Sequence, residues 1–167
     1  MIDLPDRKFS RFRAKDEPEA AEKIGAALRT VKQATGNHLI GIASGARGGD
    51  ILFHERCRHL GIPTHMILPL PPDEFIDRSV TGTATGNWTA RFRELWEGTD
   101  QERRSIVDKS GMDPFIACNN AILELANRHS PFHLIALWDG EKSDGQGGTI
   151  DLIQTAVRLG DQPTIIS

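Results

Sequence analysis

A glycine-rich turn in the first third of the sequence has the residue types that bind anions. Its glycines are Gly45, Gly48 and Gly49, which follow an apolar run and precede a stretch with helical spacing. Glycine lets backbone N–H groups approach an anion closely, and a helix start adds unpaired amides and the positive end of the helix dipole. Arg47 lies between the glycines. It would add charge-assisted hydrogen bonds to a phosphate, or it would be a solvated loop charge.

Ser44 opens this turn and Asp50 closes it. Asp50 is a candidate N-cap of the following helix, and a carboxylate there would discourage a phosphate from binding directly on the cap. His54 comes one helical turn later, where it would either contact a ligand or pack inside the fold. Taken alone, the turn is also compatible with the strand-to-helix loop of any α/β protein.

A second turn of the same kind lies near the end of the sequence. An apolar run at residues 132–138 precedes three more glycines, and a helical pattern follows at 149–159. Because the carboxyl ends of parallel strands meet at one edge of a sheet, we expect the two turns to share a ligand. Acids here would accept sugar hydroxyls, and a threonine hydroxyl would both cap the helix and bind the ligand. The candidate residues of this region are Asp139, Asp144, Gly145, Gly147, Gly148 and Thr149.

The elements that position the first turn form a βαβ unit. The pattern predicts a strand at 39–43, a helix from Asp50 to Leu60 that ends at Gly61, and a second strand at 64–70. Before this unit, a capping box of Asp16 and Glu19 predicts the start of an amphipathic helix that ends near Gly36.

The remaining elements follow from proline positions and apolar spacing. A proline-rich segment ends the second strand, and Asp73 and Glu74 begin a short helix, where they would bind ribose hydroxyls or simply favour the helix dipole. Asp113 and Pro114 predict another helix start. A last short strand is expected at 163–166. A core-facing aromatic stripe is predicted at Trp88, Phe92, Leu95 and Trp96.

Together these patterns predict one α/β domain over residues 1–167. We expect a Rossmann-like open, mostly parallel sheet of about 4–5 strands, with helices on both faces. The chain is 38% hydrophobic and 26% charged, which is ordinary for a single globular domain.

Charge and cysteine content exclude several classes of protein. A net charge of −3 and a pI near 6.1 argue against a general nucleic-acid or membrane-surface binder. No apolar run approaches the roughly 20 residues of a membrane span. Cys57 and Cys118 lack metal-ligand spacing and are expected to be buried thiols in the cytoplasm, and neither a metal nor a cofactor is predicted.

Both glycine turns resemble loops of one superfamily. The segment 44–50, followed by a helix with His54, resembles the loop of DNA-processing protein A. The segment 145–149 resembles a degenerate PGGxGT loop of the Lonely Guy phosphoribohydrolases. Both families belong to the SLOG superfamily of Rossmann-like nucleotide-binding domains. The sequences GARGGDILFHE, LPLPPDEF and DGQGGT are also similar to bacterial SLOG-like domains joined to signalling modules.

The resemblance implies three functions of different classes. The first is binding or sensing of a nucleotide-derived ligand, in a homodimer or a fusion to signalling modules. The second is an N-glycosidase acting on a nucleoside monophosphate, with Asp151 as the catalytic carboxylate. Asp151 matches the first glutamate of the Lonely Guy GTxEE pattern, but Leu152 replaces the second. The third is a DNA-associated module, which the acidic net charge disfavours. The departure from GTxEE favours binding over hydrolysis.

Overall fold

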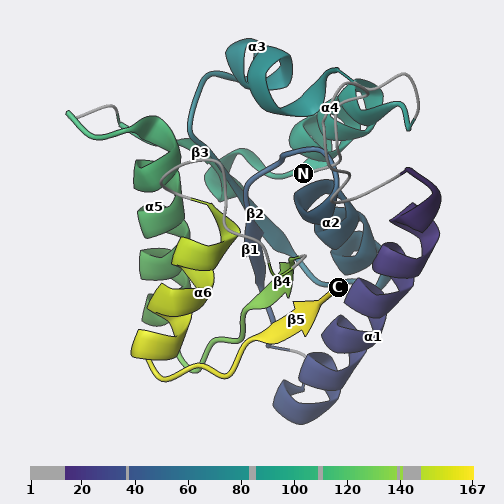
Figure 1. Cartoon of the computed structure of the whole chain (residues 1–167), viewed down its shortest axis with the longest axis vertical. Coiled ribbons are helices and arrows are strands. Elements are labelled where there is room, and N and C mark those ends of the chain that lie inside the picture. Colours follow the sequence, from purple (N-terminus) through teal and green to yellow (C-terminus); the bar gives the residue numbers. More distant parts are fainter. Residues whose placement is uncertain (1–13, 37, 83–85, 109–110, 139, 141–147) are drawn as a thin grey trace.

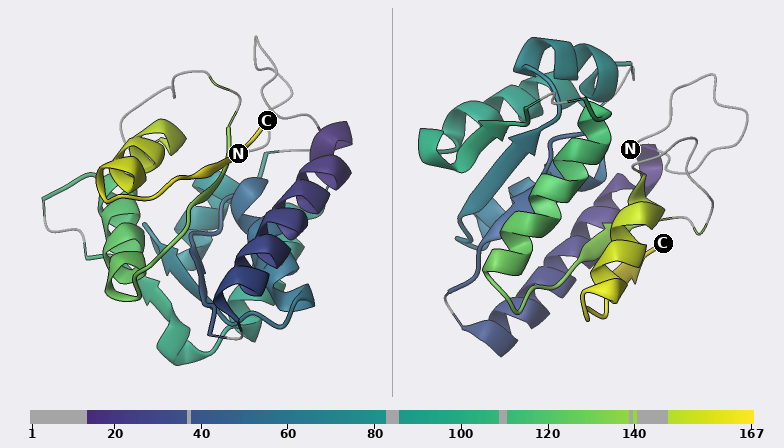
Figure 2. Two further views of the ribbon diagram at one scale, coloured as in Figure 1. Left: turned by 90° about the horizontal axis from the view of Figure 1, so that it is seen from below. Right: turned by 90° about the vertical axis from the view of Figure 1, so that its left-hand side faces the viewer.

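The computed structural model describes residues 14–36, 38–82, 86–108, 111–138, 140 and 148–167 (Figure 1). Within these residues, parallel strands lie between two groups of helices. Helices α1 and α2 lie on one side of the strands, and α5 and α6 lie on the other (Figures 1 and 2). The predicted α/β class with helices on both sides is confirmed.

The helices and the strands other than β3 follow the order expected from the sequence, whereas β3 was not predicted. The helices are α1 (Glu17–Thr35), α2 (Gly49–His59), α3 (Pro72–Phe75), α4 (Trp88–Gly98), α5 (Pro114–Arg128) and α6 (Thr149–Arg158). Short helical turns occur at η1 (Ala14–Asp16), η2 (Ile76–Val80) and η3 (Gln101–Arg103). The strands are β1 (Gly41–Ala43), β2 (Thr64–Leu68), β3 (Arg104–Ile106), β4 (Ile135–Leu137) and β5 (Thr164–Ile166).

The strands of the described residues form two small parallel sheets. One sheet has the order β1-β2-β3, with Gly41 opposite Thr64, and the other pairs β4 with β5. The single sheet of four or five strands that we expected is therefore not seen. Instead, Ile135 and Leu137 of β4 pack against the main hydrophobic core, so side-chain contacts rather than a backbone ladder connect the two sheets.

The core lies between β2 and the helices that cover it. Met66 and Leu68 of β2 are fully buried, as are Ile51 of α2 and Phe92 of α4. The aromatic stripe of α4 is confirmed as core, because Trp88 and Leu95 are also buried and Trp96 stacks on Phe92 with ring centroids 6.3 Å apart.

Cys57 and Cys118 are buried free thiols, as predicted. Gly41 allows α2 to pack closely on β1, since a Cβ there would lie 2.9 Å from the Cys57 Sγ atom.

The helix ends were predicted with mixed success. Gly36, with φ +73°, follows the end of α1, and the Asp113 carboxylate caps α5 by accepting from Phe115 N at 2.9 Å and Ile116 N at 3.2 Å. The capping box at the start of α1 is wrong. The Asp16 side chain makes no capping hydrogen bond, and Pro18 lacks the N–H that a cap would accept.

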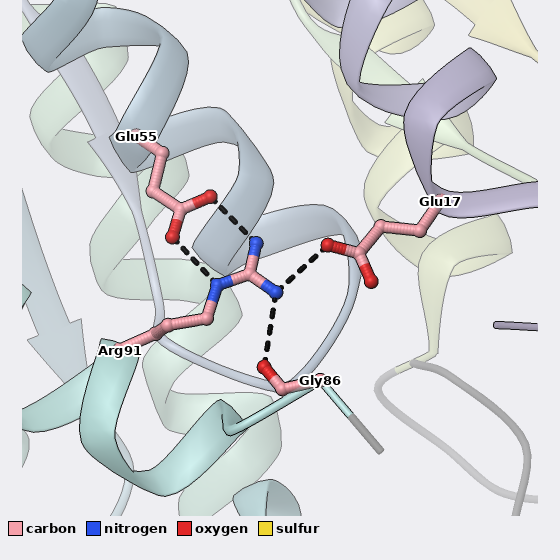
Figure 3. Close-up of polar contacts among 4 residues, drawn as sticks. All are labelled: Glu17, Glu55, Gly86 and Arg91. Carbon is pink, nitrogen blue, oxygen red and sulfur yellow. Dashed lines mark hydrogen bonds and ion pairs between the residues drawn. The ribbon is translucent and has the colours of Figure 1, made fainter.

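One arginine connects three helices (Figure 3). The Arg91 guanidinium of α4 forms a two-bond ion pair with the Glu55 carboxylate of α2, and both N–O distances are 2.7 Å. It also donates to Glu17 of α1 at 2.8 Å and to the Gly86 carbonyl at 3.2 Å. The guanidinium lies 4.0 Å from the centroid of the Trp88 ring. Because all three charged side chains are at most a quarter exposed, this network fixes α1, α2 and α4 together.

Candidate functional site

The first glycine turn joins β1 to α2, and its backbone requires glycine at one position. Gly48 has φ +93° and ψ −121°, a conformation that residues with a side chain rarely adopt. Gly48 is also the N-cap of α2, so the prediction that Asp50 is the N-cap is wrong. Asp50 lies in the first helical turn, and its Oδ2 atom accepts a hydrogen bond of 3.1 Å from Ala46 N. It therefore stabilises the turn from inside.

Gly45 and Gly49 both lie against side chains of neighbouring elements. A Cβ atom at Gly45 would lie 2.7 Å from the ring of Phe92, so α4 can approach the turn only because residue 45 is glycine. A Cβ atom at Gly49 would lie 3.5 Å from the Leu137 Cβ atom, which is an ordinary contact. Leu137 ends β4, so the start of α2 and the end of β4 are direct neighbours.

Arg47 is not a solvated loop charge. Its side chain is only 4% exposed, and Nη1 donates to the Thr81 carbonyl at 2.6 Å. Its backbone N–H donates to the Ser79 carbonyl at 3.1 Å. Arg47 therefore anchors the glycine turn to η2 and to Thr81, which follows it. Sequence reasoning missed Ser79 and Thr81, because no pattern in the sequence relates them to a turn more than thirty residues earlier.

His54 packs beneath the turn. The residue is 1% exposed, and its Nε2 atom lies 2.8 Å from the Ser44 carbonyl, to which it donates in the neutral ring. Nδ1 has no hydrogen-bond partner among the described residues. Burial lowers the pKa of His54, and the hydrogen bond with the Ser44 carbonyl only partly opposes this effect. The neutral imidazole therefore holds the first residue of the turn.

The buried His54 should make stability depend on pH. In the unfolded chain a histidine takes up a proton near pH 6.5, whereas the folded state keeps His54 neutral to lower pH. As the pH falls below about 6.5, the unfolded state binds the extra proton, and the free energy of unfolding decreases by up to about 1.4 kcal/mol per pH unit. Between pH 7.5 and pH 5.5, we expect His54→Gln to lose less free energy of unfolding than the unmodified chain. Urea unfolding at the two pH values measures this difference.

A matched control is His38→Gln, which replaces an exposed histidine. This variant should keep the pH dependence of the unmodified chain. An unchanged pH dependence in His54→Gln would show that His54 is not held neutral by the fold.

The hydrogen bonds of the turn define which amides remain for a ligand. The N–H groups of Ala46 and Arg47 are bonded to Asp50 and to the Ser79 carbonyl. Within the described part of the chain, the N–H groups of Gly48 and Gly49 have no protein acceptor. These two amides point from the N-terminus of α2, so they are the donors that can bind an anion or a ligand oxygen.

Cys118 lies near the same turn, and its thiol is buried. Burial raises the pKa of its thiol to about 12, although a hydrogen bond with the Ser44 side chain acts in the opposite direction. The Sγ atom donates to the Ile67 carbonyl at 3.2 Å. Ser44 therefore stabilises buried groups through both its carbonyl and its hydroxyl.

The second glycine turn is described from Gly148 onward. Gly148 is the N-cap of α6 in an extended conformation, and Thr149 is the first helical residue, so the prediction that the Thr149 hydroxyl caps the helix is wrong. Asp151 is exposed in the first turn of α6, and its N–H donates to the Gly148 carbonyl at 3.1 Å. Helices α2 and α6 both begin at the edge where β1 and β4 end (Figure 1). The other candidates, Asp139, Asp144, Gly145 and Gly147, lie outside the described residues.

A cavity of about 160 Å³ lies between α2 and α4. Its wall includes Pro63 and Thr64 at the amino end of β2, whereas the glycine turns follow the carboxyl ends of the strands. The ion pair of Arg58 with Glu94, at 2.9 Å, joins the two helices beside it. Both side chains are more than half exposed. His54 also lines this cavity, so the cavity reaches the residue that supports the first glycine turn.

Neither a metal site nor a membrane-spanning helix is supported by the described residues. They contain no group of three or more side chains suited to hold a metal ion. No helix among them is both long and apolar enough to cross a bilayer. In comparisons with known proteins, no family model, no curated protein and no solved structure matches this chain.

Proposed function

We propose that this chain binds a nucleotide-derived ligand at the edge where its two glycine turns meet. The observation that supports this function best is the pair of N–H groups of Gly48 and Gly49, which have no protein acceptor in the described residues and lie at a helix N-terminus. The contact between Gly49 and Leu137 brings the end of β4 beside the start of α2, which supports a ligand shared by the two turns.

The first turn is organised for binding before any ligand arrives. Arg47, Asp50 and His54 each hold it from inside through a hydrogen bond of 3.1 Å or less. A turn that is already ordered loses little conformational entropy when it binds, so more of the interaction energy contributes to affinity. On this proposal the Gly48 and Gly49 amides bind a phosphate or a ribose oxygen, and Gly148 and Thr149 contact the other end of the ligand.

The proposal places the chain in the SLOG superfamily and in the cytoplasm. In that fold the two hydrogen-bonded sheets act as one Rossmann-like sheet, with β4 beside β1. The βαβ unit around the first turn, formed by β1, α2 and β2, supports this assignment. It is the arrangement in which nucleotides bind beyond the carboxyl ends of parallel strands.

Binding is a better proposal than glycoside hydrolysis. In the Lonely Guy pattern two neighbouring acids follow the threonine, whereas here Leu152 takes the place of the second acid and is half-buried. Asp151 alone would have to activate the reaction. We therefore expect nucleoside monophosphates to be bound without release of free base, as measured by chromatography after overnight incubation. Base release that Asp151→Asn abolishes without loss of binding would instead identify a glycosidase.

A thermal-shift screen over nucleosides, mononucleotides, dinucleotides and cyclic nucleotides tests the proposed function. A ligand at 100 times its dissociation constant should stabilise the fold by roughly 2.7 kcal/mol. For a domain of this size that corresponds to an increase in Tm of roughly 5–10 °C. If no compound in the screen raises the Tm, the proposed function is wrong.

A further inference from the structure

We propose that Thr164, His133 and Asp161 form a second site, which takes the acyl group from small carboxylic esters or thioesters. His133 precedes β4, Thr164 begins β5, and Asp161 follows α6. Strands β4 and β5 are parallel, so both begin at the same end of the fold (Figure 1). The glycine turns follow the carboxyl ends of β1 and β4 instead. This second site is therefore separate from the proposed nucleotide site and does not depend on it.

A continuous chain of hydrogen bonds joins the three side chains. The Asp161 Oδ1 atom lies 3.1 Å from His133 Nδ1, and His133 Nε2 lies 2.8 Å from the Thr164 Oγ1 atom. A carboxylate only accepts, so the Nδ1–H group donates to Asp161. In the neutral ring Nε2 is then an acceptor, and the Thr164 hydroxyl donates to it. Carboxylate, imidazole and hydroxyl in this order are the arrangement that activates the nucleophile of many hydrolases.

Asp161 is held in place by backbone contacts as well. Its side chain is 4% exposed, and its Oδ2 atom accepts from Leu134 N at 2.8 Å. The Asp161 N–H group donates to the Ala156 carbonyl at 3.0 Å, in the turn that ends α6. A buried carboxylate fixed in this way orients the imidazole and stabilises the imidazolium that forms when His133 takes up a proton.

The base and the hydroxyl are accessible to a substrate. The His133 side chain is 28% exposed, and Thr164 is partly exposed. The backbone of Thr164 is fixed, because its N–H group donates to the Leu134 carbonyl at 2.9 Å. An ester at the surface can therefore approach Oγ1 while the hydroxyl stays bonded to the base.

The residue after Thr164 provides a donor for the oxyanion of the reaction. Strand β5 bonds to β4 through Thr164 N and through the Ile166 carbonyl, which accepts from Trp138 N at 2.8 Å. The intervening Ile165 N–H group therefore faces away from β4, toward an edge that has no other strand beside it in the described residues. A backbone N–H group directly after the nucleophile is a common oxyanion donor in acyl transfer.

The reaction balances in two steps at these atoms. Thr164 Oγ1 attacks the acyl carbon while His133 Nε2 takes the hydroxyl proton, and the bond from that carbon to the leaving oxygen or sulfur breaks as His133 returns the proton to it. Water, deprotonated by His133, then attacks the new ester, which releases the carboxylic acid and restores the Thr164 hydroxyl. The threonine methyl group crowds the attacked carbon, so we expect acetyl-sized groups with a good leaving group to react best.

The test is incubation of the full chain with p-nitrophenyl acetate. We expect a rapid burst of nitrophenolate that approaches the amount of chain present, and peptide mass spectrometry should find an acetyl group on Thr164. Thr164→Val is close in size but lacks the hydroxyl, so it should lose the burst. Thr164→Ser keeps a hydroxyl without the methyl group and should retain it.

His133→Gln removes the base, and Asp161→Asn changes the tautomer of His133. An asparagine amide that donates to Nδ1 leaves the proton on Nε2, which then cannot accept from Thr164. Both variants should slow acetylation by at least about a hundredfold. The NMR shifts of the His133 ring nitrogens report the change of tautomer in Asp161→Asn, and circular dichroism verifies the fold. A slower reaction can then be attributed to the tautomer rather than to unfolding.

His38→Gln and Thr35→Val are the matched controls. Both residues are exposed, and the Thr35 hydroxyl donates to the Val31 carbonyl within α1 at 2.9 Å. Both variants should react like the unmodified chain. Acetyl groups on other side chains with none on Thr164 of the unmodified, folded chain would overturn the proposal, as would an unchanged burst in His133→Gln. The mapping on the unmodified chain decides the question for any variant that fails to fold.

Discussion

Arg91→Met is expected to lower the free energy of unfolding by about 2–3 kcal/mol. The methionine keeps the apolar part of the side chain but removes the ion pairs that join α4 to Glu55 and Glu17. Both carboxylates are about a quarter exposed, so they would keep a partly desolvated charge without a partner. The contact with Trp88 would lose its cationic component as well. Thermal unfolding should show a Tm lower by roughly 5–10 °C.

The matched control for this prediction is Arg58→Met. Arg58 forms an ion pair of similar length with Glu94, also between α2 and α4, but both side chains are more than half exposed. Solvent screening makes such a surface pair worth less than about 1 kcal/mol. Equal losses in the two variants would show that the Arg91 network adds nothing beyond an ordinary surface ion pair.

Gly48→Val is expected to reduce ligand affinity at least about a hundredfold, equivalent to about 2.7 kcal/mol. A β-branched side chain at φ +93° is strained, so the backbone would rotate and move the Gly48 and Gly49 amides away from the ligand. Calorimetric titration with the best ligand from the screen measures the effect. Circular dichroism verifies that the variant is folded, because the strain alone costs about 1–3 kcal/mol.

Gly61→Val separates strain from binding. Gly61 also has a positive φ, +65°, but it lies at the opposite end of α2, and a Cβ there would meet no other atom within 4 Å. We expect this variant to lose a similar amount of stability and to keep its affinity. Full affinity in Gly48→Val would show that the ligand does not use this turn.

The local features of the fold were predictable because short-range patterns determine them. The βαβ unit, the apolar stripe of α4 and the Asp113 cap each depend on residues within a few positions of one another. The division into two sheets was not predictable in this way. It depends on backbone pairing between β4 and its neighbours, and an apolar run specifies burial without specifying which strands form hydrogen bonds.

At the candidate site, residue type does not specify what each side chain contacts. Arg47 between glycines indicates a phosphate contact, yet its guanidinium is bonded to Thr81, thirty-four positions later in the sequence. Gly45 suggests an anion-binding backbone, whereas its close contact is with the ring of Phe92 in α4. Both roles come from tertiary contacts, which a turn sequence alone does not specify. What remains for a ligand is the pair of amides at Gly48 and Gly49.

The most direct test of that conclusion is a backbone amide NMR titration with the best ligand from the thermal-shift screen. We predict that the amide resonances of Gly48 and Gly49 shift downfield and that those at the start of α6, Thr149 and Ile150, also move. Amides beside the cavity between α2 and α4, such as Thr64 and Thr99, should not move. Shifts confined to that cavity, with Gly48 and Gly49 unchanged, would contradict the account.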